Sequence, residues 1–409
     1  MARTMNNARG TFAALSYPSY RLWFFGQMTS LFGTWMQSAA QGYLVYELTH
    51  SAAYLGYVSF ASGIAMWVFT LYGGVVADRV PRRSLLVVTQ GLSMLLALVL
   101  SALTFTRVVA PWHILGLAFL LGAVNAFDVP ARQSFVIEMV GRDDLTNAIA
   151  LNSMMFNAAV VAGPAIGGVT YALFGPGWCF AINGVSFVAV IAALLAMRLA
   201  PLAQPVRRSS ALSEIREGLR VVAGDRGILA LVALMGALSL FGMSYVTLMP
   251  AWAVRVLHGD ARTNGFLQSA RGLGALAAAF GIASLGRFRF RGRLLAAGSI
   301  LFPAALVLFS FTHALPLSLL ALLLVGAANI SINSLANSLV QTRTPDAVRG
   351  RVMSIYNLFF MGLIPIGSLL AGAIAEKGGA PLAVRIGAGG TLACAVAIQI
   401  AAPSLRKAE

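Results

Sequence analysis

Long apolar runs alternate with short polar segments along nearly the whole chain of 409 residues. Each run is at least about 20 residues long, which is the length that an α-helix needs to cross the hydrocarbon core of a membrane. Lipid offers no partner to an unpaired backbone N–H or C=O group, so each run is predicted to be helical. The pattern predicts an all-α membrane protein with twelve spanning helices, near residues 21–46, 52–77, 84–106, 112–139, 146–174, 178–199, 227–254, 262–286, 294–312, 315–341, 350–375 and 381–402.

The two halves of the chain repeat each other. The tetrapeptide Ser-Leu-Phe-Gly at 30–33 recurs at 239–242, and Gly-Ala-Val-Asn at 122–125 recurs as Gly-Ala-Ala-Asn at 326–329. Each copy falls in the same ordinal helix of its half. Because a half of six helices has an even number of spans, the two halves run in the same direction and form a parallel repeat. Such a repeat places a substrate site between the halves near the membrane midplane. We therefore expect a six-helix half at 1–200, a cytoplasmic linker at 201–226 with a short amphipathic helix at 211–222, and a second six-helix half at 227–409.

Polar side chains form helical stripes on a few of the predicted spans. They recur every three or four residues in the first, fourth and tenth spans, which puts each set on one helix face. Amides are costly against lipid, so each stripe should face a cavity or hydrogen-bond to another helix. Three stripes together favour a polar substrate path, with Gln27, Ser30, Thr34, Gln37, Gln41, Asn125, Asn329 and Asn333 as its candidate residues.

Charge is scarce and unevenly distributed. Hydrophobic residues make up 59% of the chain and charged residues 10%, with a net charge of +16. The arginines gather in alternate loops, and since cytoplasmic loops collect basic residues, both termini are predicted to be cytoplasmic. The basic charge is thus accounted for by membrane topology and gives no reason to expect nucleic acid as a partner.

Asp128 is the one acid that lies clearly inside a predicted span. An ionisable group at a helix centre costs roughly 2.5–3.5 kcal/mol or more, which indicates a compensating role. Burial favours the neutral acid, whereas Arg132, one turn away, favours the carboxylate. Two roles fit: Asp128 carries a proton as access alternates, or it forms a permanent ion pair with Arg132 or Arg82 near the cytoplasmic gate.

Arg271 is a cation about three turns into the eighth predicted span. It can meet an anionic substrate, reach toward the membrane surface or pair with a helix end.

The sequence lacks the motifs of ATP-driven pumps and of enzymes. The two lysines, Lys377 and Lys407, follow Glu376 and Arg406 rather than glycine, so the chain has no phosphate-binding loop of an ATP-driven pump. We find no arrangement of nucleophile and base, no metal-ligand pattern and no cofactor motif, and we expect neither an enzyme nor a bound metal.

The loop after the second span carries Gly74, Asp78, Arg79, Arg82 and Arg83. This spacing resembles the cytoplasmic signature of the major facilitator superfamily. The resemblance covers the whole chain and is strongest to the enterobactin-exporter-like branch of bacterial siderophore and drug efflux proteins. It implies that Asp78 latches the outward-facing state by docking on the eleventh helix, whereas a plain basic loop that sets topology is the alternative.

The fifth span contains Gly163, Pro164, Gly167 and Gly168, a run similar to the signature of exporters in the same superfamily. The glycines also suit close helix packing, and the proline permits a kink. The efflux direction therefore follows from the resemblance, while the residues themselves also fit a purely structural role.

The resemblance implies a secondary active transporter of the bacterial inner (plasma) membrane that exports a small organic molecule, siderophore-like or an amphiphilic drug, by alternating access. We expect proton antiport, contact with membrane lipids, and a monomer as the working assumption. The fourth span lacks the central arginine of many proton-coupled drug exporters, so proton coupling rests on Asp128 instead. A lipid or lysolipid flippase of the same fold and a non-transporting membrane sensor or scaffold are the alternatives.

Overall fold

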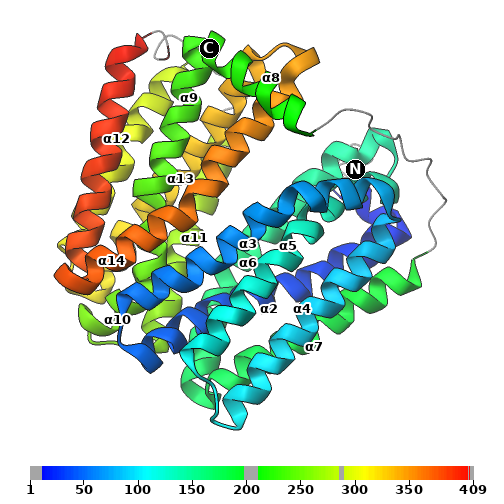
Figure 1. The fold of residues 1–409 in the computed structure, drawn as a ribbon, viewed down its shortest axis with the longest axis vertical. Helices are drawn as coiled ribbons and strands as arrows, with labels where there is room; N and C mark the ends of the chain where they lie inside the picture. The colour runs from blue at the N-terminus through cyan, green and yellow to red at the C-terminus, as the bar shows by residue number, and fades with distance from the viewer. Residues whose placement is uncertain (1–11, 198–210, 285–289, 404, 406–409) are drawn as a thin grey trace, which may run out of the picture. The chain divides into compact units, whose positions relative to one another are not determined.

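The computed structural model describes residues 12–197, 211–284, 290–403 and 405, and every regular element in these ranges is helical (Figure 1). The chain divides into two compact units. Unit 1 comprises Met1–Leu44 and Ile64–Arg207, and unit 2 comprises Val45–Gly63 and Arg208–Glu409. The segment Val45–Gly63 therefore packs with the second half of the chain. The predicted division at residue 200 places this segment in the first half.

The described residues of the first half of the chain form six long helices and two short 3-10 turns. Pro111 and Pro176 occupy first-turn positions, where the missing N–H group costs nothing, and Gly175 has a φ of 88°, which glycine adopts without strain. The elements are η1 (Ala13–Ser16), α2 (Pro18–Thr49), α3 (Ala52–Arg79), α4 (Arg82–Phe105), α5 (Pro111–Met139), η2 (Arg142–Asp144), α6 (Leu145–Phe174) and α7 (Pro176–Ala196).

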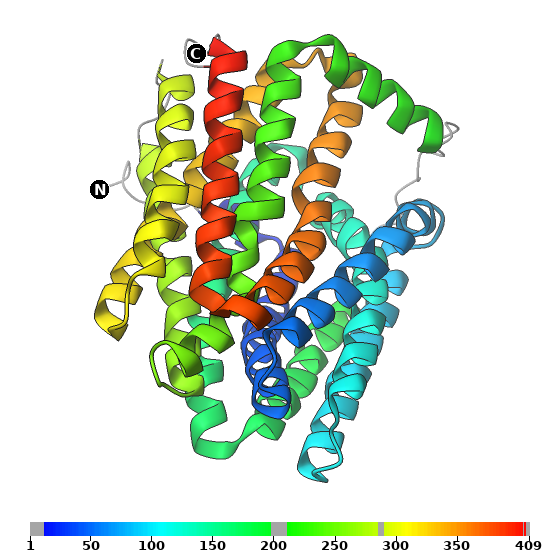
Figure 2. The same cartoon turned by 60° about the vertical axis from the view of Figure 1, so that its left-hand side comes forward.

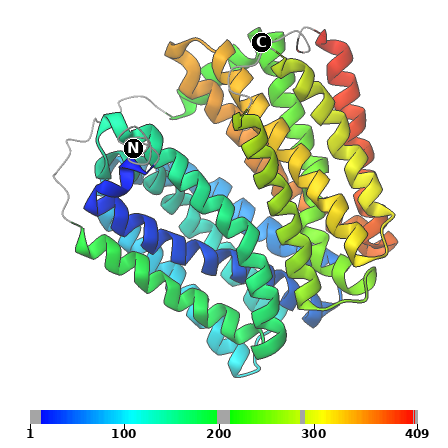
Figure 3. The same ribbon diagram turned by 180° about the vertical axis from the view of Figure 1, so that it is seen from behind.

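Helix α2 lies between α6 and α7 in unit 1, as seen from behind in Figure 3. A Cβ atom on Gly33 of α2 would lie 2.6 Å from Asn183 Oδ1 of α7, so a side chain at residue 33 would push the two helices apart. On the same helix, the Trp23 ring meets Phe135 of α5 edge-on, with centroids 5.6 Å apart. Such edge-to-face pairs add to the apolar core, which here joins α2 to α5.

The second half begins with an amphipathic helix, which confirms the helix predicted at 211–222; residues 201–210 of the expected linker lie outside the described ranges. Asp225 then caps the next helix by accepting from the N–H groups of Gly227 and Ile228. The elements are α8 (Ala211–Gly224), α9 (Arg226–Ala237), η3 (Leu238–Gly242), η4 (Met243–Leu248), α10 (Met249–Arg255), α11 (Ala261–Ser284), α12 (Arg291–Ser310), α13 (Leu315–Arg343) and α14 (Asp346–Ala401).

Helix α14 is two helices joined at Gly379, whose φ of 81° and ψ of 160° are not helical. Figure 2 shows the chain reversing there, from the orange segment to the red one. Glycine adopts this backbone without strain, and Pro381 follows it as a helix start. The break separates the spans predicted at 350–375 and 381–402.

Helices α11 and α13 approach each other through glycine in unit 2. A Cβ on Gly274 would lie 2.0 Å from the carbonyl oxygen of Leu323, and one on Gly326 would lie 2.0 Å from that of Arg271. Without a driving force from water, membrane helices associate where small residues let their backbones touch. This contact fixes the position of Arg271 relative to α13.

Ten helices in the described part of the chain are long and apolar enough to cross a membrane. One runs from Val348 to Ala401 and includes the break at Gly379, and another runs from Arg226 to Arg255 through η3 and η4. Helix α2 is not among the ten, and its polar residues are the physical reason. Many large apolar side chains remain exposed, which suits contact with lipid acyl chains.

Candidate functional site

The carboxylate of Asp128 lies buried between α4 and α5, with 1% of its side chain exposed. Its Oδ1 accepts from Thr89 Oγ1 at 2.8 Å and from Gln90 Nε2 at 2.7 Å, both on α4. Its Oδ2 accepts from the guanidinium of Arg132 on α5. Since three donors, one of them a cation, surround the group, the geometry suits an ionised carboxylate rather than a neutral acid.

Arg132 differs from Asp128 in its exposure. Its side chain is 29% exposed, so the cation reaches the edge of the packed helices while its partner does not. Arg82, the other partner predicted for Asp128, instead pairs with Glu138, with NH1 and Oε1 2.5 Å apart. The buried acid is therefore held by Arg132 on the same helix, and a second ion pair, between Arg82 and Glu138, joins α4 to α5.

Pro130 interrupts the hydrogen bonding of α5 between Asp128 and Arg132. Because proline has no N–H, the carbonyl of Ala126 lacks its helical partner. A Cβ on Gly73 of α3 would lie 2.0 Å from that carbonyl oxygen, so only glycine fits there. Helix α3 is thus packed directly on the turn of α5 that precedes the buried acid.

The basic loop that follows α3 is described only in part. Arg79 is exposed, and Arg83 donates to the carbonyl of Leu195 at 2.7 Å, joining α4 to the end of α7. A Cβ on Gly74 would meet nothing within 4 Å. The side chain of Asp78 lies outside the described part of the structure, so the predicted latch remains a hypothesis.

The polar stripe of α2 divides into buried and exposed members. Gln27, Ser30 and Gln37 are buried, Gln41 is half-buried and Thr34 is exposed. Gln37 Oε1 accepts from Asn183 Nδ2 of α7 at 2.7 Å, so this residue joins two helices. Gln27 Oε1 is buried without a hydrogen-bond partner among the described residues. The stripe thus combines helix packing with polar groups that remain available.

Gly163 and Gly167 place α6 directly on α2. A Cβ on Gly163 would lie 2.5 Å from Trp35 Cβ, and one on Gly167 would lie 2.7 Å from the carbonyl oxygen of Met36. Pro164 and Gly168 are buried in the same helix. These contacts give Gly163 and Gly167 a packing role whatever the direction of transport.

The seventh predicted span is not a regular helix. Its middle consists of a π-helical turn, η3, followed by a 3-10 segment, η4. Ser239 Oγ in η3 donates to the carbonyl of Phe360, and Thr247 Oγ1 lies 2.8 Å from Ser368 Oγ, which anchors the segment to α14. Irregular backbone within a span is tolerated where protein or a cavity surrounds it, and such turns are frequent at functional sites.

Arg271 of α11 lies beside this irregular segment. Its guanidinium interacts electrostatically with the hydroxyl of Tyr245 in η4, which is 2% exposed. Tyr245 Oη and Arg271 Nε are both buried. The guanidinium lies within hydrogen-bonding reach of the Tyr245 hydroxyl, whereas Arg271 Nε has no hydrogen-bond partner among the described residues. A buried arginine Nε without an acceptor, next to a tyrosine hydroxyl, suits an incoming anionic or carbonyl-bearing group.

The polar residues of α13 lie on the same side of unit 2. Asn329 Nδ2 contacts Met243 Sδ of η4 at 3.1 Å, and Asn333 Nδ2 points back to the Asn329 carbonyl at 3.5 Å. Both are half-buried, as is Asn125 of α5, at the repeat position of Asn329 in unit 1. In unit 2 the candidate residues therefore come together around η4, while those of unit 1 are divided between α2 and α5.

Four participants were missed by the stripe analysis: Thr89, Gln90, Asn183 and Tyr245. Thr89 and Gln90 are adjacent in sequence and form no stripe, although a glutamine within an apolar run is itself a signal. Their roles became visible only through their partners on other helices. The described residues contain no group of three His, Cys, Asp or Glu side chains arranged to hold a metal ion.

The chain is similar to known transport proteins over most of its length. The sequence pattern of the transmembrane secretion effector family matches residues 9–409. The staphyloferrin A transporter of Staphylococcus aureus is 26% identical over 358 residues, covering 87% of this chain and 89% of that protein. The multidrug efflux pump Tap of Mycolicibacterium fortuitum is 27% identical over 365 residues (87% and 88%), and the enterobactin exporter of Citrobacter koseri is 26% identical over 362 residues (88% and 86%).

Two solved structures have the same fold. The nucleoside transporter NupG has a TM-score of 0.73 at 15% identity, covering 95% of this chain and 98% of that one. A bacterial homologue of the human lysosomal transporter Spinster, in an inward-facing conformation, has a TM-score of 0.68 at 15% identity, covering 95% and 96%.

Proposed function

Because the chain belongs to the transmembrane secretion effector family of the major facilitator superfamily, we propose that it exports a siderophore-like molecule or an amphiphilic drug across the bacterial inner membrane. It is a multi-pass membrane transporter and not an enzyme. The proposed cycle is alternating access, and the coupling ion is the proton. The names of three relatives, two of siderophore transporters and one of a drug pump, support this choice of substrate class.

The proposed architecture is twelve spans in two six-helix halves, with a linker at 201–226 and both termini in the cytoplasm. Helix α2 supplies the first span and α14 the last two. Corresponding glycine contacts in the two units support the repeat. Gly163 of the fifth span meets the first span at Trp35, and Gly367 of the eleventh meets the seventh at Leu240, where a Cβ would lie 2.1 Å from the carbonyl oxygen.

The observation that carries the proposed coupling is the set of donors around Asp128. The side chain lies inside a span and both of its oxygens accept hydrogen bonds, from Thr89, Gln90 and Arg132, which supports a role in proton coupling. Arg132 is the partly exposed partner, so a rotation of its side chain toward water removes the one cation and favours protonation. A proton then binds in one conformation and leaves in the other.

The test uses purified protein in liposomes with an imposed pH gradient, and records substrate-induced proton flux for siderophores, amphiphilic drugs and lysolipids. Asp128→Asn retains the shape of the side chain and one acceptor oxygen but cannot take up a proton. We expect it to lose coupled proton flux. Glu138→Gln, which neutralises the neighbouring pair with Arg82, is the matched control and should retain it.

The outcomes separate the alternatives. Lysolipid movement without proton flux in the wild type would make the protein a flippase and Asp128 a gating residue. No flux of any compound would favour a sensor or scaffold. Normal coupled flux in Asp128→Asn would remove Asp128 as the proton carrier while leaving export itself standing.

We propose that unit 2 provides the substrate contact, because Arg271 Nε is buried without an acceptor beside Tyr245 of η4. The proposed substrate therefore carries an anionic or carbonyl oxygen. Arg271→Gln should raise the KM for acidic substrates more than for neutral ones, whereas Arg262→Gln, an exposed arginine at the start of the same helix, should change neither. Equal effects on both substrate types would contradict an anion contact.

A further inference from the structure

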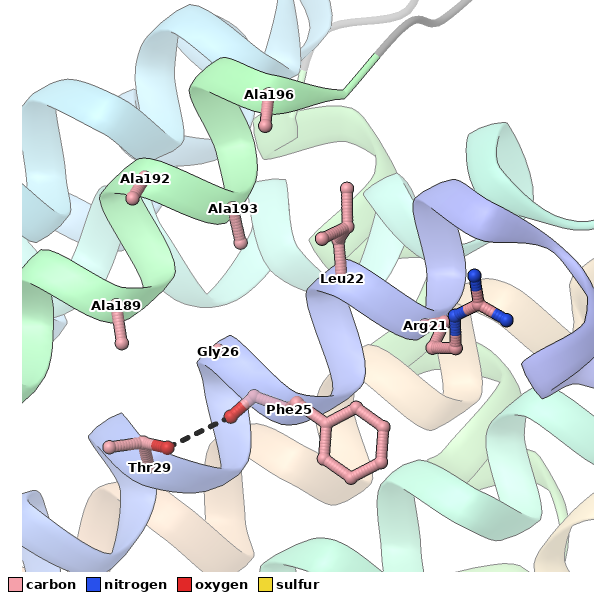
Figure 4. A pocket seen from close by; sticks show the side chains of 9 residues that line it. All are labelled: Arg21, Leu22, Phe25, Gly26, Thr29, Ala189, Ala192, Ala193 and Ala196. Atoms are coloured by element: carbon pink, nitrogen blue, oxygen red, sulfur yellow. Dashed lines mark hydrogen bonds between the residues drawn. The ribbon is translucent and has the colours of Figure 1, made fainter.

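A groove of about 630 Å³ runs along the surface of unit 1 between α2 and α7 (Figure 4). It extends from Arg21 and Ala196 at one end to Thr29 and Ala189 at the other. At 1.5 Å per residue, the α2 side of the groove is about 12 Å long. Its lining includes none of the candidate transport residues, so it is a feature separate from the proposed substrate path.

The groove is open because α7 contributes small residues. Its wall on α7 consists of four alanines, and α2 approaches it at Gly26, where a Cβ would lie 3.0 Å from Ala193 Cβ. Leu22 and Phe25 of α2 project beside this row with 41% and 51% of their surface exposed. The helices touch, yet none of the described residues fills the space above the contact.

The interior of the groove has little to offer a polar ligand. Thr29 donates its hydroxyl to the carbonyl of Phe25 at 3.0 Å, so its polar group is satisfied within α2. The remaining lining between the two ends is aliphatic or aromatic. An apolar occupant therefore loses no hydrogen bond on entering.

Positive charge is concentrated at one end of the groove. Arg21 is exposed, and its guanidinium makes no hydrogen bond or ion pair with any residue in the described part of the chain. Outside the lining, Arg83 of α4 donates to the carbonyl of Leu195, the residue before Ala196. None of the described residues that line the groove is acidic. A guanidinium matches the geometry of a phosphate group, and the guanidinium of Arg21 has no anionic partner among the described residues.

We propose that this groove binds an anionic phospholipid, with one acyl chain along the alanine face of α7 and the phosphate on Arg21. The apolar groove fits an acyl chain in shape, and the arginine at its end complements the negative charge of the lipid phosphate. Arg83 adds to the positive potential at the headgroup. Tyr20 and Trp23, close to Arg21 in the sequence, are buried in the core, whereas Arg21 lies at the end of the groove.

Native mass spectrometry of the purified protein, titrated with phosphatidylglycerol or phosphatidylcholine of equal chain length, tests the proposal. One tightly bound phosphatidylglycerol is expected per chain. Since each arginine near an anionic surface contributes about 1 kcal/mol, Arg21→Gln should weaken phosphatidylglycerol binding about fivefold and leave phosphatidylcholine binding unchanged. Arg107→Gln, on the loop between α4 and α5, is the control for loss of one positive charge.

The apolar part of the site needs its own variant. Ala192→Leu places a larger side chain at an exposed position in the groove and should weaken binding of both lipids, whereas Ala150→Leu at an exposed position of α6 should not. Inorganic phosphate should fail to displace the lipid, because the acyl chain supplies much of the contact. An unchanged preference for phosphatidylglycerol in Arg21→Gln, or unchanged binding in Ala192→Leu, would overturn the proposal.

Discussion

Glu376 of α14 accepts a hydrogen bond from Ser51 Oγ at 2.9 Å, although the two residues lie 325 positions apart in the sequence. The same oxygen accepts from the backbone N–H of Ala53 at 3.1 Å. The carboxylate therefore performs the capping function for the first turn of α3, where N–H groups have no helical partner. This links the break in α14 to the start of α3 within unit 2.

Loss of the Glu376 carboxylate should loosen the start of α3. Glu376→Ala leaves the Ala53 N–H and the Ser51 hydroxyl without their acceptor, and loss of a cap costs about 1 kcal/mol. We expect hydrogen exchange of the amides at residues 52–56 to accelerate about fivefold, which is the same free energy expressed as a rate. Lys377→Ala, at the adjacent exposed position, should leave their exchange unchanged.

Alanine substitutions at Gly73 and Gly74 should have different effects on thermal stability. A methyl group at 73 meets the Ala126 carbonyl, and overpacking of this kind costs about 1–3 kcal/mol, so Gly73→Ala should lower the thermal stability in detergent. A methyl group at 74 meets nothing, and alanine favours a helix by about 0.5–1 kcal/mol, so Gly74→Ala should be neutral or stabilising. Equal loss of stability in both variants would contradict the close approach of α3 to α5.

Thr89 should contribute to stability through the charge that it contacts. Thr89→Val removes a donor to the buried carboxylate of Asp128, and hydrogen bonds to charged groups are worth about 1.5–3 kcal/mol. Unfolding by denaturant should reveal a loss of this size. Thr104→Val is the matched control on the same helix, because the Thr104 hydroxyl donates only to the Leu100 carbonyl. A similar loss in both variants would argue against an ionised Asp128.

Tyr17 should ionise at a higher pH than an ordinary tyrosine. Its hydroxyl donates to Asp144 Oδ2 at 3.0 Å, and this hydrogen bond to a carboxylate raises the pKa of Tyr17 above its ordinary value of 10.0. The raised pKa means that the contact stabilises the fold below pH 10.0 and is lost as the pH rises through the higher value. The tyrosinate absorbance that is missing from Tyr17→Phe should therefore develop above pH 10.0. Development at lower pH would contradict the contact.

The sequence by itself determined the helices and the rare groups inside them. The spans predicted at 84–106 and 315–341 correspond to α4 (Arg82–Phe105) and α13 (Leu315–Arg343) within two residues. Hydrophobic length is a local property, because each apolar run must satisfy its own backbone in lipid. For the same reason Asp128 and Arg271 were evident as candidates: a charge in an apolar run is costly wherever the helix packs.

Only the tertiary structure decided what each polar residue contacts. Gln37 and Thr34 belong to one predicted stripe, yet Gln37 bonds to Asn183 of α7 while Thr34 is exposed. Asp128 was predicted with one of two arginines, and its donors Thr89 and Gln90 come from another helix. Helical periodicity assigns residues to a face, whereas the neighbour of that face depends on where backbones can approach.

The irregular backbone at 238–248 was likewise decided by packing. The sequence Ser-Leu-Phe-Gly forms a regular helix at 30–33 and a π-helical turn at 239–242, although the four residues are identical. In the second copy, Ser239 donates to Phe360 of α14, and the turn lies beside Gly367 of that helix. Identical local preferences thus give different backbones, because the contacts that select between them come from residues more than a hundred positions away in the sequence.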